Sequence, residues 1–234
     1  MDVESSAIIG KGIQKAYRSG SISTPVLTGI DLRIERGECV FLAGPSGSGK
    51  STLLSILGCD LTPDEGEIQI LGENVTQFRP RDQARFRRQR IGFVFQRFHL
   101  IRALRAWENV AVALNLLGQS TSAAKKEAYQ LLDAVGLADK SSSHVSQLSM
   151  GQRQRVAMAR ALAGDPELIL ADEPTAALDA ETGLTAMTLL RELTTRRGKT
   201  VFVVTHDPRI FSMADRILYL EDGRIATITA DALT

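Results

Sequence analysis

One segment of this sequence, residues 44–52, has the residue types and spacing of a phosphate-binding loop. An apolar run at 39–43 predicts a buried strand before it, and the apolar spacing at 52–57 predicts a helix after it. Strand, glycine-rich loop and helix in this order are the context in which the pattern G-x-x-x-x-G-K-[ST] binds phosphate. The loop consists of Gly44, Pro45, Ser46, Gly47, Ser48, Gly49, Lys50, Ser51 and Thr52.

The residues of this loop suit a phosphate chain. Gly44, Gly47 and Gly49 let the backbone turn several N–H groups inward, and the positive end of the following helix adds to this anion site. Lys50 can reach the β- and γ-phosphates of a nucleotide as a point charge, and the hydroxyl of Ser51 can bind Mg²⁺. The alternative, a glycine-rich turn with a chance lysine, leaves the flanking strand and helix unexplained.

Polar side chains follow two further strand patterns. Asp172 and Glu173 come after the apolar run 168–171, and His206 comes after the run 200–205. Open α/β sheets place their ligands at the carboxyl ends of the strands. Asp172 can hold Mg²⁺ through water, and Glu173 can orient and deprotonate an attacking water. A lone histidine is more often structural, but His206 is expected at the same sheet edge as the two carboxylates, which favours a catalytic role.

Two features have alternative interpretations. Tyr17 ends a strand pattern at 7–17, and its ring either packs in the sheet or stacks on an adenine ring.

Residues 79–90 contain six arginines and one aspartate, a local charge of +5. Phe86 is the aromatic residue of this segment, and the rest of the chain has no basic excess. A solvated helix face, or a face near lipid headgroups, is therefore favoured over a nucleic-acid site.

The first third of the chain predicts an antiparallel sheet. Alternating apolar and polar residues at 28–35 and 67–72 indicate strands that accompany the strand at 7–17. Residues 19–25 are expected to form a polar turn. The strand that carries the phosphate-binding loop differs from these three, because it is apolar on both faces and is typical of a parallel sheet.

The apolar spacing predicts that the middle of the chain is nearly all helical. An expected linker at 139–147, which contains three consecutive serines, separates the first two helical patterns from the third. We expect one domain over residues 1–234 with an α/β fold, in which a helical subdomain at roughly 97–165 is inserted. Residues 217–228 predict a closing hairpin with an Asp-Gly turn. The helical patterns lie at 106–117, 123–135 and 153–163.

Composition limits the class of protein. A chain of 234 residues with 44% hydrophobic content suits one domain, and its formal net charge of +1 indicates no attraction to nucleic acid. Cys39 and Cys59 are expected to be reduced thiols in or near the core, which favours a reducing cytoplasm. We expect no signal peptide and no membrane span, so any role at a membrane would depend on a partner chain.

These motifs together resemble those of the nucleotide-binding subunit of an ABC transporter, over roughly residues 7–228. Residues 44–52 resemble its Walker A loop, and 168–173 resemble Walker B. Residues 148–152 resemble the signature Leu-Ser-Gly-Gly-Gln, with Met150 in place of the first glycine. Tyr17 matches the aromatic residue that stacks on adenine, and Gln96 matches the glutamine of the Q-loop. Asp179 matches the D-loop aspartate, and His206 matches the switch histidine.

The resemblance implies a P-loop NTPase (RecA-like) core with an antiparallel β subdomain and an inserted α-helical subdomain. It also implies a head-to-tail dimer, expected to consist of identical subunits, that encloses ATP between them. The signature of one subunit would contact the γ-phosphate held by Walker A of the other. These signature residues are Ser149, Met150, Gly151 and Gln152.

The resemblance also assigns roles at the phosphate. Glu173 would be the catalytic base, and His206 would contact the γ-phosphate. Mg²⁺ would be bound by Ser51 and Gln96 and, through water, by Asp172. Gln96 would also couple the site to the helical subdomain, whose surface near 97–107 would receive a coupling helix of the membrane partner.

Two residues depart from the family pattern. A side chain at Met150 would crowd the dimer, although Ser149 and Gly151 are retained. Val145 stands where relatives often have proline, which affects the stiffness of the linker and leaves the chemistry unchanged.

The segments 91–96, 107–110 and 205–210 resemble the lipoprotein-releasing, macrolide-export and glycolipid-export group. This implies an export motor for a separate integral membrane permease that has a large extracytoplasmic domain or a periplasmic adaptor. The subunit would be cytoplasmic and peripheral on the inner face of the cell membrane. The alternative is a regulatory ABC ATPase that signals through a membrane partner without transport. An ABC protein acting on ribosomes or DNA is disfavoured, because such proteins usually have two fused ATPase domains or a long coiled coil.

Overall fold

The computed structural model describes residues 5–228 and contains two β-sheets. The larger sheet has the strand order β10-β9-β3-β8-β7-β6, and its neighbours are parallel except for the β9–β10 hairpin. Strands β3 and β7 flank β8 and run parallel to it, so the carboxyl ends of these three strands meet at one edge. The strands are β3 (Cys39–Ala43), β6 (Ile91–Val94), β7 (Leu168–Asp172), β8 (Thr200–Val204), β9 (Arg216–Glu221) and β10 (Arg224–Ile228).

The smaller sheet is antiparallel, with the order β2-β1-β4-β5. Its strands are β1 (Ser6–Ser19), β2 (Ile22–Glu35), β4 (Glu65–Ile70) and β5 (Glu73–Asn74). The expectation of a polar turn at 19–25 was wrong for most of that segment, because the pairing of β1 with β2 continues to Ser19 and Ile22. Only Gly20 and Ser21 form the turn. Residues 22–25 are exposed and include a serine and a threonine. This end of the ribbon therefore lacks the apolar alternation that marks a half-buried strand.

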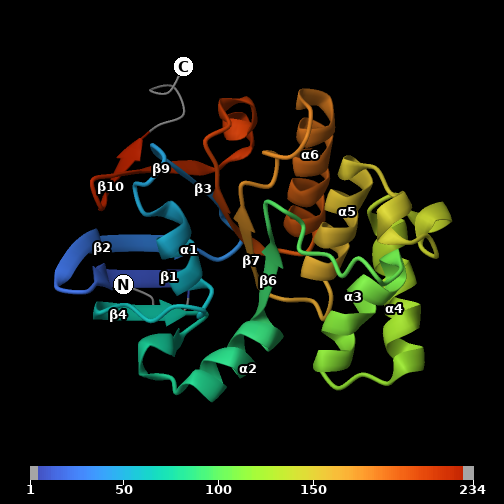
Figure 1. Cartoon of the computed structure of the whole chain (residues 1–234), viewed down its shortest axis with the longest axis horizontal. Coiled ribbons are helices and arrows are strands. Elements are labelled where there is room, and N and C mark those ends of the chain that lie inside the picture. Colours follow the sequence, from blue (N-terminus) through green and yellow to red (C-terminus); the bar gives the residue numbers. More distant parts are fainter. Residues whose placement is uncertain (1–4, 229–234) are drawn as a thin grey trace.

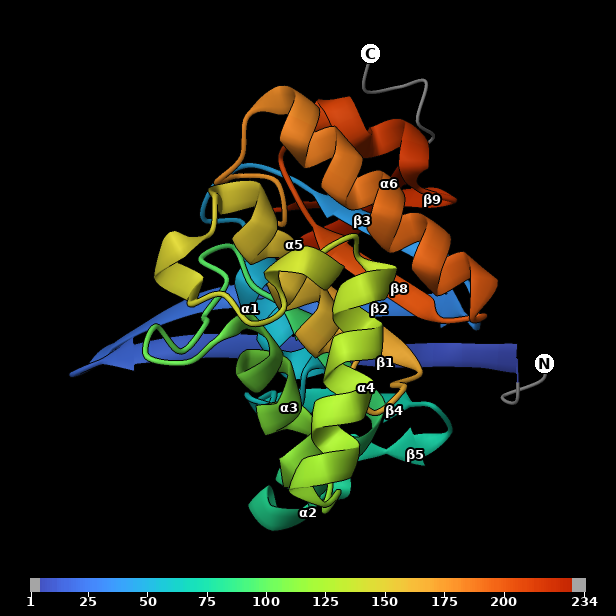
Figure 2. The same ribbon diagram turned by 90° about the vertical axis from the view of Figure 1, so that its right-hand side faces the viewer.

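Within residues 5–228, six α-helices accompany the sheets. Figures 1 and 2 show α3, α4 and α5 grouped together on one side of the parallel sheet, away from β1, β2 and β4. The expected linker at 139–147 instead contains two 3₁₀ turns, and Ser141 and Val145 within it are buried. The helices are α1 (Lys50–Leu57), α2 (Pro80–Arg90), α3 (Ala106–Leu116), α4 (Thr121–Ala134), α5 (Met150–Ala161) and α6 (Ala180–Arg196).

The parallel sheet separates two hydrophobic cores. Along β3, Cys39 and Phe41 belong to the core shared with α3–α6, whereas Val40 and Leu42 belong to the core beneath the antiparallel sheet. Cys39 and Cys59 are buried free thiols, as expected, and burial raises the pKa of each to about 11. The architecture confirms the expected α/β fold with an antiparallel sheet and an inserted group of helices.

Candidate active site

The phosphate-binding loop connects β3 to α1, and its shape requires glycine. Gly44, Gly47 and Gly49 have φ values of 145°, 82° and 103°, in the region that side-chain-bearing residues rarely adopt. At Gly44 a Cβ atom would lie 2.1 Å from the carbonyl oxygen of Leu220 in β9, so any residue larger than glycine would clash with that strand. The loop is therefore packed tightly against the sheet edge.

Lys50 is the first residue of α1, and its ammonium group lies inside the curve of the loop. Its Nζ donates to the carbonyl oxygens of Gly44 and Pro45, each at 2.8 Å, and the residue is buried. These contacts hold the positive charge at the centre of the loop, where the N-terminus of α1 adds to the positive potential. An anion that enters the loop meets both sources of charge.

Glu173 and His206 come together beside the loop, from the ends of neighbouring strands. His206 Nδ1 lies 2.7 Å from Glu173 Oε1, and the backbone N–H of His206 donates to Glu173 Oε2 at 3.3 Å. The glutamate side chain is 13% exposed and the histidine side chain 69%. The carboxylate is thus nearly enclosed while the imidazole faces the opening.

A hollow of about 680 Å³ is lined by the phosphate-binding loop and by the Glu173–His206 pair. Tyr17 is 48% exposed, and its hydroxyl lies 3.4 Å from Thr52 Oγ1. A half-exposed ring at the rim favours the stacking interpretation over simple packing in the sheet. The hollow is lined by Tyr17, Val26, Gly44, Pro45, Ser46, Gly47, Gly49, Lys50, Ser51, Thr52, Gln96, Glu173 and His206.

Asp172 lies behind the loop rather than in this hollow. It lines an adjoining cavity together with Ser51, which borders both spaces. Its Oδ1 is buried without a hydrogen-bond partner. Burial and the neighbouring Glu173 raise the pKa of Asp172, which Lys50 partly opposes.

An unpartnered buried carboxylate oxygen that shares a cavity with a serine is chemically suited to a hard divalent cation. Within residues 5–228 no group of three or more His, Cys, Asp and Glu side chains forms a metal cage. This donor set fits Mg²⁺, which is commonly bound by one or two carboxylates together with substrate phosphates. The residues that would hold it are Ser51, Gln96 and, through water, Asp172.

The signature-like residues lie at the start of α5, and none of them lines the hollow of its own chain. Ser149 caps the helix: its Oγ accepts from the backbone N–H of Gln152 at 3.2 Å, and Gln152 Oε1 accepts from the Ser149 N–H at 2.9 Å. Met150 is 49% exposed. A Cβ atom at Gly151 would lie 2.4 Å from Thr182 Cγ2, so α6 packs directly against this turn.

Asp179 caps the next helix. Its Oδ1 accepts from the backbone N–H of Thr182 at 2.9 Å, and this bond is the main cause of its lowered pKa. The sequence analysis did not predict that Asp179 caps α6. It also missed Thr175 and Asp207, which hydrogen-bond to each other next to the Glu173–His206 pair. A carboxylate directly after His206 at the same sheet edge was a signal that could have identified Asp207.

Comparison with known proteins places these motifs in a family. Residues 27–176 match the family model described as ABC transporter. The macrolide export ATP-binding/permease protein MacB of Wolinella succinogenes is 46% identical over 92% of this chain, but the chain spans only 33% of that protein. An uncharacterized ABC transporter ATP-binding protein of Methanocaldococcus jannaschii, MJ1508, is 44% identical over 94% of this chain and 98% of its own length.

Solved structures give the same result. The ATP-binding cassette MJ0796, in a dimeric post-hydrolysis state bound to ADP and Pi, superposes with a TM-score of 0.88. It is 42% identical in sequence, and the match covers 95% of this chain and 98% of that one. This likeness extends over both sheets and the inserted helices.

Proposed function

Since this chain belongs to the ABC transporter family, we propose that it is an ATPase whose dimer is the motor of an exporter, acting through a separate membrane permease. The observation that carries this proposal is the Glu173–His206 pair, held at 2.7 Å beside the phosphate-binding loop in one hollow. A base and a histidine next to a phosphate cradle are the parts needed to hydrolyse a terminal phosphoanhydride.

The hollow accounts for binding of ATP. Tyr17 would stack on the adenine ring, while the N–H groups of the loop surround the phosphates. Lys50 would bring its charge to the β- and γ-phosphates. Mg²⁺ on Ser51, Gln96 and the water shell of Asp172 would neutralise charge on the phosphate oxygens.

The same residues account for hydrolysis. Glu173 accepts a proton from the attacking water as the water oxygen bonds to the γ-phosphorus. The bond from that phosphorus to the β–γ bridging oxygen breaks, which yields ADP and phosphate. His206 would contact the γ-phosphate, and its ring is held in orientation by Glu173. Positioning and charge stabilisation supply most of the barrier reduction in phosphoryl transfer.

We propose that a second, identical copy completes each site. The N-terminus of α5 with Ser149 and Gly151 lies outside its own hollow, so it is available to the γ-phosphate held by a partner. The relative MJ0796 forms a dimer, which supports this arrangement.

Met150→Gly tests the departure from the family signature. The Met150 side chain is half exposed at the first position of α5, so its removal opens space toward the partner without creating a cavity. We expect ATP turnover to stay the same or to rise. Steady-state phosphate release measures this, and a clear loss would show that the methionine is a functional part of this signature.

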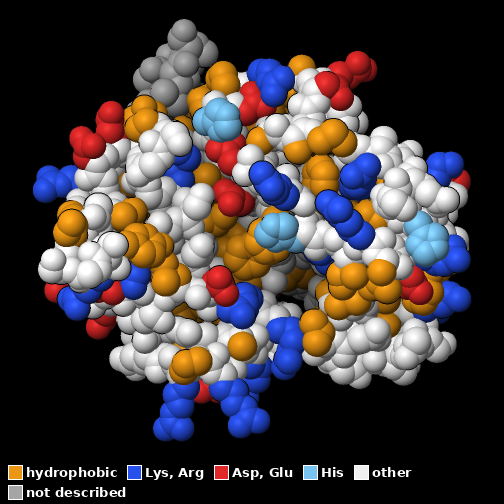
Figure 3. All heavy atoms as spheres, in the orientation of Figure 1, with side chains coloured by type: hydrophobic (Ala, Val, Ile, Leu, Met, Phe, Trp, Pro, Cys, Tyr) orange, Lys and Arg blue, Asp and Glu red, His pale blue; other side chains and the backbone are white. Residues whose placement is uncertain are grey.

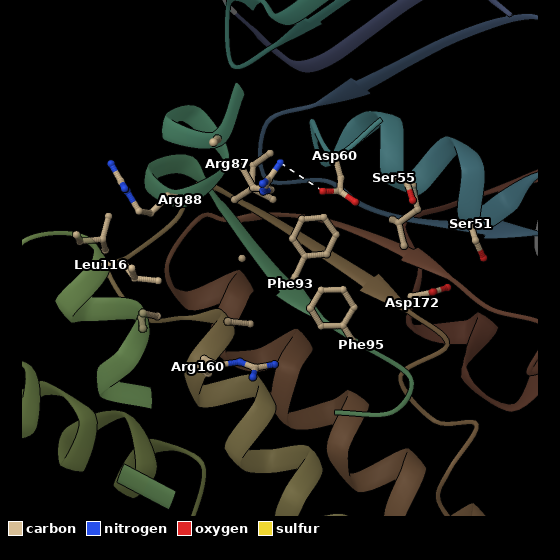
Figure 4. A pocket seen from close by; sticks show the side chains of 18 residues that line it. Ser51, Ser55, Asp60, Arg87, Arg88, Phe93, Phe95, Leu116, Arg160 and Asp172 are labelled. Carbon is tan, nitrogen blue, oxygen red and sulfur yellow. Dashed lines mark ion pairs between the residues drawn. The ribbon is translucent and has the colours of Figure 1, made fainter. Parts of the chain in front are cut away.

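A second cavity supports the proposal of a permease partner. It has a volume of about 520 Å³ and extends from Ser51 and Asp172, behind the phosphate-binding loop, to Leu116 and Arg88 at its outer end (Figure 4). Phe93 stacks on Phe95 along its wall with ring centroids 5.2 Å apart. A cavity with both apolar and charged walls that reaches the Mg²⁺ residues is suited to receive a helix of the permease and to transmit its movement.

The segment 97–107 is tied to this cavity. Arg160 of α5 lines the cavity and donates to the carbonyl oxygens of Phe98 at 2.7 Å and His99 at 2.6 Å. The Q-loop residue Gln96 directly precedes this segment. A coupling helix seated here would therefore act on α5 and on Gln96 together.

We propose that the face around this cavity is turned toward the membrane. Figure 3 shows basic side chains projecting from the lower edge of the molecule, where Figure 1 shows α2. Arg81, Arg85 and Arg88 on this helix are exposed, which suits a surface near anionic headgroups. Phe86 is buried, so this helix offers no aromatic ring to a nucleic-acid base. Among residues 5–228, no helix combines the length and apolar character needed to cross a bilayer.

Leu116→Glu tests the permease seat. Leu116 is 59% exposed at the mouth of the cavity. Because the variant loses an apolar contact and buries a carboxylate, we expect permease capture to weaken about tenfold or more. The measurement is recovery of the permease from detergent-solubilised membranes on tagged Glu173→Gln protein with ATP.

The matched control is Ile22→Glu, since Ile22 is exposed on the β1–β2 ribbon and lies outside both cavities. Recovery of only soluble ribosomal or DNA-associated proteins would contradict the membrane role. ATP hydrolysis without movement of any substrate, in vesicles that contain the captured permease, would favour the regulatory alternative.

A further inference from the structure

The turn that follows β7 holds Glu173 in an unusual conformation. Its φ is 45°, in the left-handed region that disfavours residues with a side chain. The backbone N–H of Glu173 donates to the carbonyl oxygen of Val204 at 2.8 Å. A strained residue persists only where its surroundings constrain it, so the contacts of the next residues decide where the carboxylate points.

The first of these contacts comes from the signature helix. Gln154 of α5 is completely buried, and its Nε2 donates to the carbonyl oxygen of Pro174 at 2.7 Å. Gln154 lies three residues after Gly151, so both are on one face of the helix. This face packs on Thr182 at one level and on the Glu173 turn at the next.

The second contact comes from the loop that carries the histidine. Thr175 is 1% exposed, and its hydroxyl donates to Asp207 Oδ2 at 2.9 Å. Arg209 donates to both carboxylate oxygens of Asp207, and chiefly for this reason the pKa of Asp207 falls to about 2. The turn is thus fixed on one side to α5 and on the other to Asp207, the residue after His206.

We propose that Gln154 is a positioning residue that couples the orientation of the signature helix to the catalytic base Glu173. The inference rests on the proposed ATPase function. The N-terminus of α5 is the part that engages the partner's ATP, and any rotation of α5 displaces the Gln154 amide. Since that amide is hydrogen-bonded to the carbonyl oxygen of Pro174, next to Glu173, closure of the dimer aligns the base within the same chain.

The test compares Gln154→Met with Thr194→Val. Methionine has a similar length but no N–H donor. Thr194 is the matched control, because it is also 0% exposed and donates to a backbone carbonyl, that of Leu190 at 2.8 Å in α6. We measure kcat and KM for ATP, the melting temperature, and ATP-dependent dimerisation in the Glu173→Gln background.

For Gln154→Met we expect kcat to fall about 10- to 100-fold, as for a misplaced base, with KM and dimerisation within about twofold of wild type. Thr194→Val is expected to lower only the melting temperature. If Gln154→Met keeps its kcat, or loses kcat, ATP affinity and dimerisation together, the positioning role is overturned.

Gln154→Glu provides an independent readout if the methionine variant folds poorly. Burial raises the pKa of a carboxyl group, and only its protonated form can donate to the Pro174 carbonyl. We expect its kcat relative to wild type to rise as the pH is lowered, and a flat ratio would contradict the proposal. A wild-type chain without ATP turnover would overturn the proposed function itself, whereas normal wild-type turnover with unaffected Gln154 variants overturns this inference alone.

Discussion

Glu173→Gln is expected to lower ATP turnover by about 10²- to 10⁴-fold while ATP binding is retained. The amide has the size of the carboxylate and can still hydrogen-bond to His206, whose Nδ1 lies 2.7 Å from the present Oε1. It cannot accept a proton from water. Because ATP is then bound but not cleaved, the enclosed dimer should accumulate.

Light scattering after gel filtration with ATP and Mg²⁺ measures this accumulation, and phosphate release measures turnover. The control is Glu192→Gln, since Glu192 is an exposed residue of α6 whose contact is an ion pair with Arg196 at 3.7 Å. Near-normal turnover of Glu173→Gln would contradict the assignment of the base.

Lys50→Ala is expected to weaken ATP binding about 100-fold or more. The ammonium group would make charge-assisted hydrogen bonds to two phosphates, each worth about 1.5–3 kcal/mol. The variant also removes the two bonds to the Gly44 and Pro45 carbonyls, so the loop itself loses support.

Titration with a fluorescent ATP analogue measures the dissociation constant, and the melting temperature separates lost binding from lost folding. Lys126→Ala is the matched control, because Lys126 is an exposed residue of α4 away from both cavities. An unchanged dissociation constant in Lys50→Ala would show that the loop binds phosphate through its backbone alone.

The buried parts of the fold were the most predictable. Strands β3, β7 and β8 are short apolar runs that end in polar residues, so their sequence indicated both a parallel sheet and a functional edge. The β1–β2 ribbon was less predictable, because the exposed residues at 22–25 carry no apolar alternation. Backbone pairing, which needs no apolar side chain, extends the ribbon there.

The motif residues of the site could be identified from their spacing, but their support could not. Gln154 and Pro174 are 20 residues apart, and Thr175 and Asp207 are 32 apart. These bonds depend on how α5 and the two strand ends meet in space, which no local pattern encodes. The cap on α6 is different, because Asp179 and Thr182 are only three residues apart. An aspartate directly before a helical pattern is a local signal, and the sequence analysis did not use it.

The central claim is that catalysis requires two copies of this chain, and its most direct test is ATP turnover per subunit across a dilution series. Light scattering on the same samples gives the fraction of dimer. We expect turnover per subunit to fall in proportion to the dimer fraction as the protein is diluted, because Ser149 and Gly151 act only on a partner's ATP. Full turnover per subunit in samples that are entirely monomeric would contradict the account.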